Sequence, residues 1–307
     1  MSSHSPFPIP HPRILLTGAQ GQVGWELCRT LSSLGQVVAM DQKSMDLADP
    51  DAIRRVVAEV RPRAIVNPAA YTAVDKAESE PELARRVNAE APGILAEEAA
   101  KSGALLVHYS TDYVFDGSGE RPWQEGDAPG PINVYGATKL AGEQAIAASG
   151  CRHLIFRTSW VYGARGANFL LTMRRLMRER PELKIVDDQI GAPTWCRSLA
   201  EATAQVLAQL ASPLGGADKP EPWGVYNMTN DGETGGYTSW HGFAQAILDL
   251  EGLETPPRLV SIPSCDYPMP APRPLNSRLD NGKLERVFGI RLPAWHQALK
   301  LCLDKAD

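Results

Sequence analysis

The chain has 307 residues, a formal net charge of −5 and 43% hydrophobic residues. This length exceeds what one core usually holds, so we expect two domains or one domain with an added lobe. The mild acidic charge argues against a nucleic-acid partner, because phosphate binding leaves a basic surface. No apolar run approaches the roughly 18 residues that span a bilayer, so no membrane segment is expected. Residues 1–12 are rich in proline, lack a signal-peptide pattern and are predicted to form a flexible tail.

The five cysteines are scattered along the chain, and no two of them form a C-x-x-C pair: Cys28, Cys151, Cys196, Cys265 and Cys302. An odd, dispersed set is typical of free thiols in a reducing compartment, which predicts a cytoplasmic protein. The histidines are equally dispersed and show no metal-ligand spacing. We therefore expect no metal site.

Short apolar runs alternate with amphipathic stretches through the first half of the chain. In chain order, the pattern predicts a strand at 13–17, a helix at 23–34, a strand at 36–40, a helix at 51–60, a strand at 64–67, a helix at 81–100 and strands at 105–108 and 153–157. Apolar strands separated by helices indicate βαβ units. This favours an α/β fold with a Rossmann-type, doubly wound parallel sheet that is covered on both faces.

The regular alternation breaks after about Gly163. A helix is predicted at 168–178, a loop at 187–194, and a helix at 198–210 followed by a strand at 224–227 that return to the sheet. Residues 254–274 hold seven prolines, too many for regular structure, and are expected to form a binding loop or lid. The predicted domains are 13–165 with 196–230 for the sheet, and 166–195 with 231–307 for a smaller C-terminal substrate-binding lobe.

A glycine-rich turn, Gly18-x-x-Gly21-x-x-Gly24, follows the first predicted strand and precedes a helix. Glycines permit the tight turn and let backbone N–H groups approach a pyrophosphate, which the helix N-terminus also attracts. Asp41 ends the second strand, where a carboxylate can accept hydrogen bonds from a ribose. These features predict that the sheet domain binds a dinucleotide, with Asp46 and Leu47 on the adenine side.

Tyr135 and Lys139 are four residues apart and therefore lie on one face of a helix. A nearby ammonium favours the phenolate, so we expect Lys139 to lower the pKa of Tyr135 and suit it for proton transfer. Thr111 follows the fourth strand, at the edge of the sheet where ligands bind. The tyrosine–lysine spacing alone also fits an exposed helical pair; the combination with the glycine turn predicts an active site.

These motifs resemble the extended short-chain dehydrogenase/reductase family. The resemblance narrows to the dTDP-4-dehydrorhamnose reductases and covers about residues 13–300. It rests on the segments 21–27, 71–78, 108–115, 133–136, 157–162, 188–194 and 276–279.

The resemblance implies the last step of dTDP-L-rhamnose synthesis, in which NADPH or NADH reduces the C4 keto group of dTDP-4-dehydro-L-rhamnose. The resemblance implies that Tyr135 is the proton donor. It also implies that Lys139 binds the nicotinamide ribose in addition to lowering the pKa of Tyr135. Thr111 would hydrogen-bond the sugar oxygen, and Asp112 and Trp160 match positions that contact the sugar. The residues expected at the dinucleotide are Gly18, Gly21, Gln22, Val23, Gly24, Asp41, Asp46, Leu47, Ala70, Tyr71, Thr72, Tyr109, Tyr135 and Lys139.

One departure concerns assembly. Some relatives form homodimers through a magnesium ion held by glutamates; Glu26 matches one ligand, but Arg197 stands where another is expected. Because Mg²⁺ requires oxygen ligands, we expect a monomer or a metal-independent homodimer.

Two other functions stay open. A nucleotide-sugar dehydratase or epimerase shares the fold, but dehydratases follow the threonine with Asp-Glu, whereas Tyr113 follows Asp112 here. The regulatory subunit of methionine adenosyltransferase also resembles this chain and would bind the dinucleotide without turnover. The set of Thr111, Tyr135 and Lys139 favours the reductase.

Overall fold

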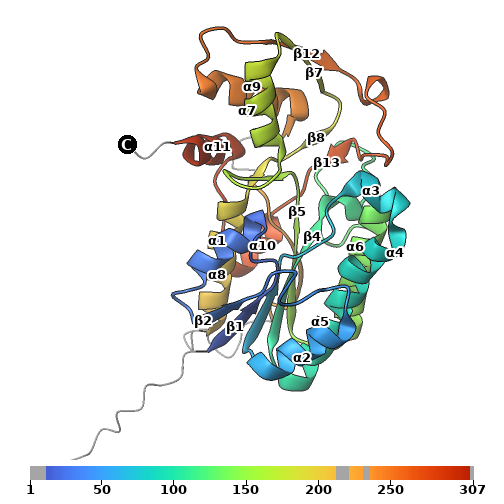
Figure 1. The fold of residues 1–307 in the computed structure, drawn as a ribbon, viewed down its shortest axis with the longest axis vertical. Coiled ribbons are helices and arrows are strands. Elements are labelled where there is room, and N and C mark those ends of the chain that lie inside the picture. Colours follow the sequence, from blue (N-terminus) through green and yellow to red (C-terminus); the bar gives the residue numbers. More distant parts are fainter. Residues whose placement is uncertain (1–11, 212–220, 231–235, 305–307) are drawn as a thin grey trace, which may run out of the picture.

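The computed structural model describes residues 12–211, 221–230 and 236–304. Its main layer is a parallel six-stranded sheet in the order β2-β1-β3-β4-β5-β10 (Figure 1). The strands are β1 (Arg13–Leu16), β2 (Gln36–Ala39), β3 (Ala64–Asn67), β4 (Leu105–Thr111), β5 (His153–Thr158) and β10 (Gly224–Asn227). The predicted doubly wound α/β fold is confirmed, whereas the predicted tail lies outside the described residues apart from Pro12.

The strand order reverses beside β1. β2 lies on one side of β1, and β3 with the later strands lies on the other side. The crevice at the carboxyl ends of β1 and β3 is the topological switch point, where open α/β sheets bind ligands. The turn that begins at Gly18 and the segment 68–72 both reach this crevice.

Helices cover both faces of the sheet (Figure 1). One face carries α1 (Gln22–Thr30), α8 (Cys196–Ala211) and α10 (Gly282–Phe288). Their side chains, among them Leu27, Leu199 and Leu284, are buried in one cluster with the sheet. The opposite face carries α2 (Pro50–Val60), α5 (Ala91–Ser102) and α6 (Val134–Ala148). Ile53, Leu95 and Ile146 are buried there.

The helix predicted at 81–100 is divided in the structure. It consists of α4 (Pro81–Arg85), a π-helical turn (Arg86–Glu90) and α5, and the unpredicted α3 (Val74–Ser79) precedes it. The π turn presents Asn88, whose Oδ1 accepts a hydrogen bond from Tyr71 N and whose Nδ2 donates to Tyr71 O. These two bonds fix the segment that follows β3. The π-helical turn therefore positions a segment that borders the crevice, and such turns are frequent at functional sites.

A smaller lobe lies beyond the carboxyl ends of the strands, at the top of Figure 1. It contains α7 (Phe169–Glu179), α9 (Trp240–Glu251), α11 (Trp295–Leu303), and the short strands β6 (Val161–Tyr162), β7 (Glu182–Val186), β8 (Ile190–Gly191), β9 (Thr194–Trp195), β11 (Thr238–Ser239), β12 (Arg258–Ile262) and β13 (Asn276–Ser277). Leu170, Phe243 and Leu299 are buried at the centre of the lobe.

The expectation that 254–274 has no regular structure is wrong in part. Strand β12 lies inside this segment and pairs in parallel with β7. The prolines at 256, 257 and 263 flank the five-residue run and do not interrupt it, so every residue of β12 keeps its backbone N–H. The predicted loop at 187–194 likewise contains β8 and the first residue of β9.

The expected return of the chain to the sheet is visible in α8, which packs on α1, and in β10, which pairs with β5. Within the segment assigned to the lobe, α10 packs on the sheet cluster. The division into two domains stays a prediction. Among the described helices, none combines the length and the apolar character that crossing a membrane requires.

Candidate active site

The glycine turn brings the backbone close to the crevice. Gly18 has φ +57°, a left-handed conformation that favours glycine. At Gly24, a Cβ atom would lie 2.1 Å from the carbonyl oxygen of Gly18, so only glycine lets α1 begin this close to the turn. Gly21 caps α1 without a side-chain hydrogen bond, which leaves the first N–H groups of the helix available to an anion.

A cavity of about 470 Å³ opens beside this turn. Ten of the residues predicted at the dinucleotide line it: Gly18, Gly21, Gln22, Val23, Gly24, Ala70, Thr72, Tyr109, Tyr135 and Lys139. The glycine turn after β1 and the helix α6, which carries Tyr135 and Lys139, therefore meet at one cavity.

Four other predicted dinucleotide residues lie outside the lining of this cavity. Asp41 is joined to the turn, because its Oδ2 accepts a hydrogen bond of 2.8 Å from Gln20 Nε2. Asp46 is exposed and Leu47 is buried in the core. Tyr71 donates a hydrogen bond of 2.5 Å to Glu80 Oε2. That bond is the main reason that the pKa of Tyr71 rises to about 12. The contacts of Asp41, Asp46, Leu47 and Tyr71 with a dinucleotide stay predictions.

Tyr135 lies in the first turn of α6. Asn133 begins this helix, since its Oδ1 accepts a hydrogen bond of 2.8 Å from Gly136 N. The Tyr135 ring packs edge-on against Tyr113, with 5.7 Å between ring centroids. Burial raises the pKa of this phenol, and the nearby side chain of Thr111, which ends β4, opposes this change. The structure thus brings together two of the three predicted catalytic residues.

Lys139 lies one turn further along α6 and is 1% exposed. Its Nζ donates a hydrogen bond of 2.6 Å to the carbonyl oxygen of Tyr109 and lies 3.1 Å from His108 Nε2. Burial lowers the pKa of Lys139 to about 8, although the carboxylate of Glu143 opposes this change.

The expected lowering of the pKa of Tyr135 is not found. Burial raises the pKa of the Tyr135 phenol, the charge of Asp112 raises it further, and the side chain of Thr111 opposes both effects. The physical reason is the direction of the Lys139 side chain, whose ammonium is bound to His108 and Tyr109.

Asp112 follows Thr111 and lies near Ser277, which was not predicted as a site residue. Thr111 Oγ1 donates a hydrogen bond of 3.0 Å to Asp112 Oδ1. Burial raises the pKa of Asp112 to about 7, and the side chains of Ser277 and Thr111 oppose this change. Ser277 is a neutral residue that comes far later in the chain. The only sequence signal for it is its place in the 276–279 segment that resembles the reductases.

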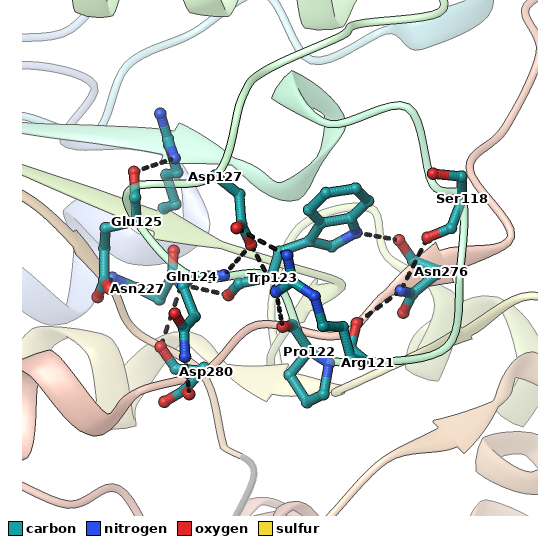
Figure 2. Close-up of polar contacts among 11 residues, drawn as sticks. Ser118, Arg121, Pro122, Trp123, Gln124, Glu125, Asp127, Asn227, Asn276 and Asp280 are labelled. Carbon is teal, nitrogen blue, oxygen red and sulfur yellow. Dashed lines mark hydrogen bonds and ion pairs between the residues drawn. The ribbon is translucent and has the colours of Figure 1, made fainter.

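A polar network holds the segment that carries Ser277 (Figure 2). Asn276 Nδ2 donates to Arg121 O at 2.8 Å, and Trp123 Nε1 donates to Asn276 O at 3.2 Å. On the other side of the segment, Gln124 Nε2 donates to Asp280 Oδ2. The loop after β4 and the last third of the chain are therefore fastened together directly beside Asp112.

Trp160 has φ +48°, which is rare and strained for a bulky residue. Its indole stacks on Trp240 with 3.7 Å between ring centroids, and its close packing on Gly191 leaves no room there for a Cβ atom. Trp240 in turn lines a second cavity of about 650 Å³, together with Tyr113, Lys184 and Arg273. Trp240, Lys184 and Arg273 stand in no recognisable spacing, and sequence reasoning missed them.

Metal-ligand groups are absent from the part of the chain that the structure describes: no three His, Cys, Asp or Glu side chains gather there. Arg197 forms an ion pair of 2.9 Å with Glu201 on the exposed side of α8. The predicted independence from metal is a statement about assembly and stays a prediction.

Comparisons with known proteins agree with this geometry. The profile of the RmlD substrate binding domain matches residues 12–307. A dTDP-4-dehydrorhamnose reductase of Burkholderia thailandensis is 51% identical over 95% of this chain and 98% of its own length. The Salmonella typhimurium enzyme of that name is 46% identical over 95% of this chain and 97% of its own length.

The chain is also similar to solved structures of dTDP-4-dehydrorhamnose reductases. The Bacillus anthracis dTDP-4-dehydrorhamnose reductase in complex with NADP superimposes with a TM-score of 0.85 and 34% identity, over 95% of this chain and 98% of that one. The Clostridium acetobutylicum reductase gives a TM-score of 0.87 and 36% identity, with the same coverage of both chains. The chain therefore belongs to the dTDP-4-dehydrorhamnose reductase family, which the RmlD substrate binding domain defines.

Proposed function

We propose that this protein reduces the C4 keto group of dTDP-4-dehydro-L-rhamnose with NADPH or NADH and so completes the synthesis of dTDP-L-rhamnose. The observation that carries the proposal is that Tyr135 and Lys139 of α6 line the same cavity as the glycine turn after β1. A candidate proton donor and a candidate pyrophosphate site therefore share one cavity.

The residues of the first cavity fit a dinucleotide. The uncapped N-terminus of α1 and the close approach of Gly18 and Gly24 suit a pyrophosphate. We assign the adenosine ribose to Asp41 and the nicotinamide ribose to Lys139. When bound, the nicotinamide cofactor supplies the hydride for C4.

We assign the dTDP portion of the substrate to the second cavity. A volume of about 650 Å³ suits a ligand of this size. Lys184 and Arg273 supply positive charge for a diphosphate, and Trp240 offers an aromatic face to a base. Trp160, which stacks on Trp240, and Asp112 then lie on the side of the sugar.

Tyr135 acts as the general acid in this proposal. As C4 is reduced, negative charge develops on its oxygen, and the phenol of Tyr135 donates a proton to that atom. Thr111 orients the same oxygen through its hydroxyl group. The ammonium of Lys139 is bound to Tyr109 O and lies against His108, and it is assigned to the nicotinamide ribose.

The protein is further proposed to act in the cytoplasm, as a monomer or as a dimer that needs no metal. The five cysteines Cys28, Cys151, Cys196, Cys265 and Cys302 are all free thiols, which supports a reducing compartment.

The test is a coupled assay that starts from dTDP-glucose with the upstream dehydratase and epimerase. We expect NADPH to be oxidised and dTDP-L-rhamnose to form, and we expect Tyr135→Phe to be inactive in the same mixture. Mass spectrometry must first confirm that the 4-keto sugar is present. Dinucleotide binding without any oxidation would contradict the proposal and favour a non-catalytic regulatory subunit.

A further inference from the structure

The chain crosses from the first cavity to the second at Asn168. Gly166 and Ala167, directly before it, line the cavity of the glycine turn. Phe169, directly after it, lines the cavity that we assign to dTDP. Three further residues of α7 line that second cavity: Thr172, Met173 and Leu176. The two cavities therefore share one short stretch of chain, with Asn168 at its centre.

The side-chain amide of Asn168 joins the elements that form the two cavities. Its Nδ2 donates a hydrogen bond of 2.8 Å to Oε1 of Gln22, the first residue of α1, which lines the first cavity. Its Oδ1 accepts a hydrogen bond of 3.1 Å from Leu171 N and so caps α7. One amide thus binds both the start of α1 and the start of α7.

The segment 163–168 lies against the start of α1. Asn168 Nδ2 is also 3.0 Å from the carbonyl oxygens of Gly163 and Arg165, so the same amide holds the segment together. Gly166 packs closely on Gln22, because a Cβ atom at Gly166 would lie 3.3 Å from Gln22 Cγ. The segment therefore covers the N-terminus of α1, where a pyrophosphate is expected.

A second contact between this segment and α1 is weaker. The guanidinium carbon of Arg165 lies 3.2 Å from the centroid of the Trp25 ring, and Trp25 belongs to α1. Cation–π contacts at exposed positions contribute little, and residues 164–167 are exposed. A ligand that binds beside the segment can therefore add to its restraint.

We propose that Asn168 is a positioning residue that couples the two ligand sites, so that the dinucleotide and dTDP each bind more tightly when the other is present. The inference rests on the proposed function, which places a pyrophosphate at α1 and dTDP beside α7. A pyrophosphate at the N-terminus of α1 restrains Gln22 and, through the amide bond to it, Asn168. Binding of dTDP restrains α7, which begins at the same side chain.

The coupling arises because both ligands depend on the order of the segment 163–168. The first ligand to bind reduces the freedom of this segment and bears the loss of conformational entropy. The second ligand meets a segment that is already fixed, and it therefore binds more tightly. Coupling between two binding equilibria is reciprocal, so the factor is the same whichever ligand is added first.

The experiment measures the Kd of dTDP by calorimetry in the full-length protein, with and without saturating NADP⁺. The ratio of the two Kd values is the coupling factor. NADP⁺ and dTDP do not react with each other, so no turnover disturbs the measurement. Kd of NADP⁺ with and without dTDP gives the same factor independently.

The main variant is Asn168→Ser. Serine caps a helix as well as asparagine does, but its side chain is one bond shorter and does not reach Gln22. Arg165→Gln removes the weaker contact with Trp25. The matched control is Arg175→Gln, which removes the same charge from an exposed ion pair on α7.

In wild type we expect NADP⁺ to lower the Kd of dTDP by about fivefold or more, which is the lower end of usual coupling. Asn168→Ser should bring the coupling factor towards 1, and Arg165→Gln should lower it by less. Arg175→Gln should keep the wild-type factor. A merely structural defect in Asn168→Ser would weaken dTDP binding equally with and without NADP⁺ and would leave the factor unchanged.

Gln22→Met tests the same hydrogen bond from its other end. It should lower the coupling factor as much as Asn168→Ser does, and the double variant should lower it no further, because both changes remove one bond. Additive losses in the double variant would show that Asn168 does not act through Gln22 and would overturn the proposal.

Two further results would overturn the coupling alone: independent binding of NADP⁺ and dTDP in wild type, or a wild-type coupling factor in Asn168→Ser. Failure of the wild-type protein to bind NADP⁺ or dTDP at all would instead overturn the proposed function, and the coupling with it. The wild-type titrations with single ligands therefore separate the two failures.

Discussion

Lys139 and His108 face one another in the interior of the protein, with 3.1 Å between Nζ and Nε2. His108 is fully buried on β4, and its Nδ1 lies 3.0 Å from Asn67 Nδ2 on β3. Burial and the charge of Lys139 lower the pKa of His108 well below its usual value, so the imidazole is neutral. Lys139, the predicted catalytic lysine, therefore lies against a neutral polar group that belongs to the central sheet.

His108→Leu should weaken dinucleotide binding, because Lys139 loses a partner that holds it at the cavity. We expect Kd to rise by about tenfold, the typical effect of losing a hydrogen bond to a charged group. His108→Gln, which keeps a hydrogen-bonding side chain, should restore part of the affinity. Calorimetry with NADPH measures both variants.

The double variant with Lys139→Met provides the control for this prediction. If His108 acts through Lys139, His108→Leu has no further effect on Kd in that background. An equal loss of affinity with and without Lys139 would show that His108 only maintains the fold.

Tyr135→Phe should lower kcat by about 10² to 10⁴, the usual contribution of a general acid. The ring and its edge-on contact with Tyr113 remain, so the Kd for NADPH should be close to that of wild type. Thr111→Val should reduce kcat by a smaller factor, since it removes an orienting hydroxyl but keeps the proton donor. Stopped-flow absorbance of NADPH checks the order, and near wild-type turnover in Tyr135→Phe would refute the mechanism.

Asp41→Ala should raise the ratio of kcat/KM for NADPH over that for NADH. A carboxylate accepts hydrogen bonds from a free ribose diol and repels a 2′-phosphate. Asp41 is already joined to the glycine turn through Gln20, which places it beside the dinucleotide site. Asp51→Asn, at an exposed position on α2, is the matched control. An unchanged ratio in Asp41→Ala would mean that Asp41 serves only its own turn, where it accepts hydrogen bonds from Lys43 N and Ser44 N.

The mass of the protein in solution should be the same with magnesium and with EDTA. Arg197 and Glu201 neutralise one another on α8, and a guanidinium cannot be a magnesium ligand. Sedimentation measures the mass under both conditions. A mass that halves on chelation would contradict this prediction.

Features that depend on neighbouring residues could be predicted from the amino-acid sequence. The strand, glycine turn and helix around Gly18 and Gly24 follow from local apolar periodicity and from the steric freedom of glycine. The spacing of Tyr135 and Lys139 placed both residues on one helix face, because an α-helix turns every 3.6 residues. Both residues line one cavity in the structure.

The distant groups that these side chains contact depend on how the strands and helices pack, and the sequence did not predict them. Lys139 lies against His108 on β4, and the pKa of Asp112 responds to Ser277 from the last third of the chain. Such contacts arise when β4, α6 and β13 pack together, and no spacing along the chain encodes them. Strand β12 was missed for a related reason: its pairing with β7 depends on a partner far away in the sequence, whereas its flanking prolines are a local signal.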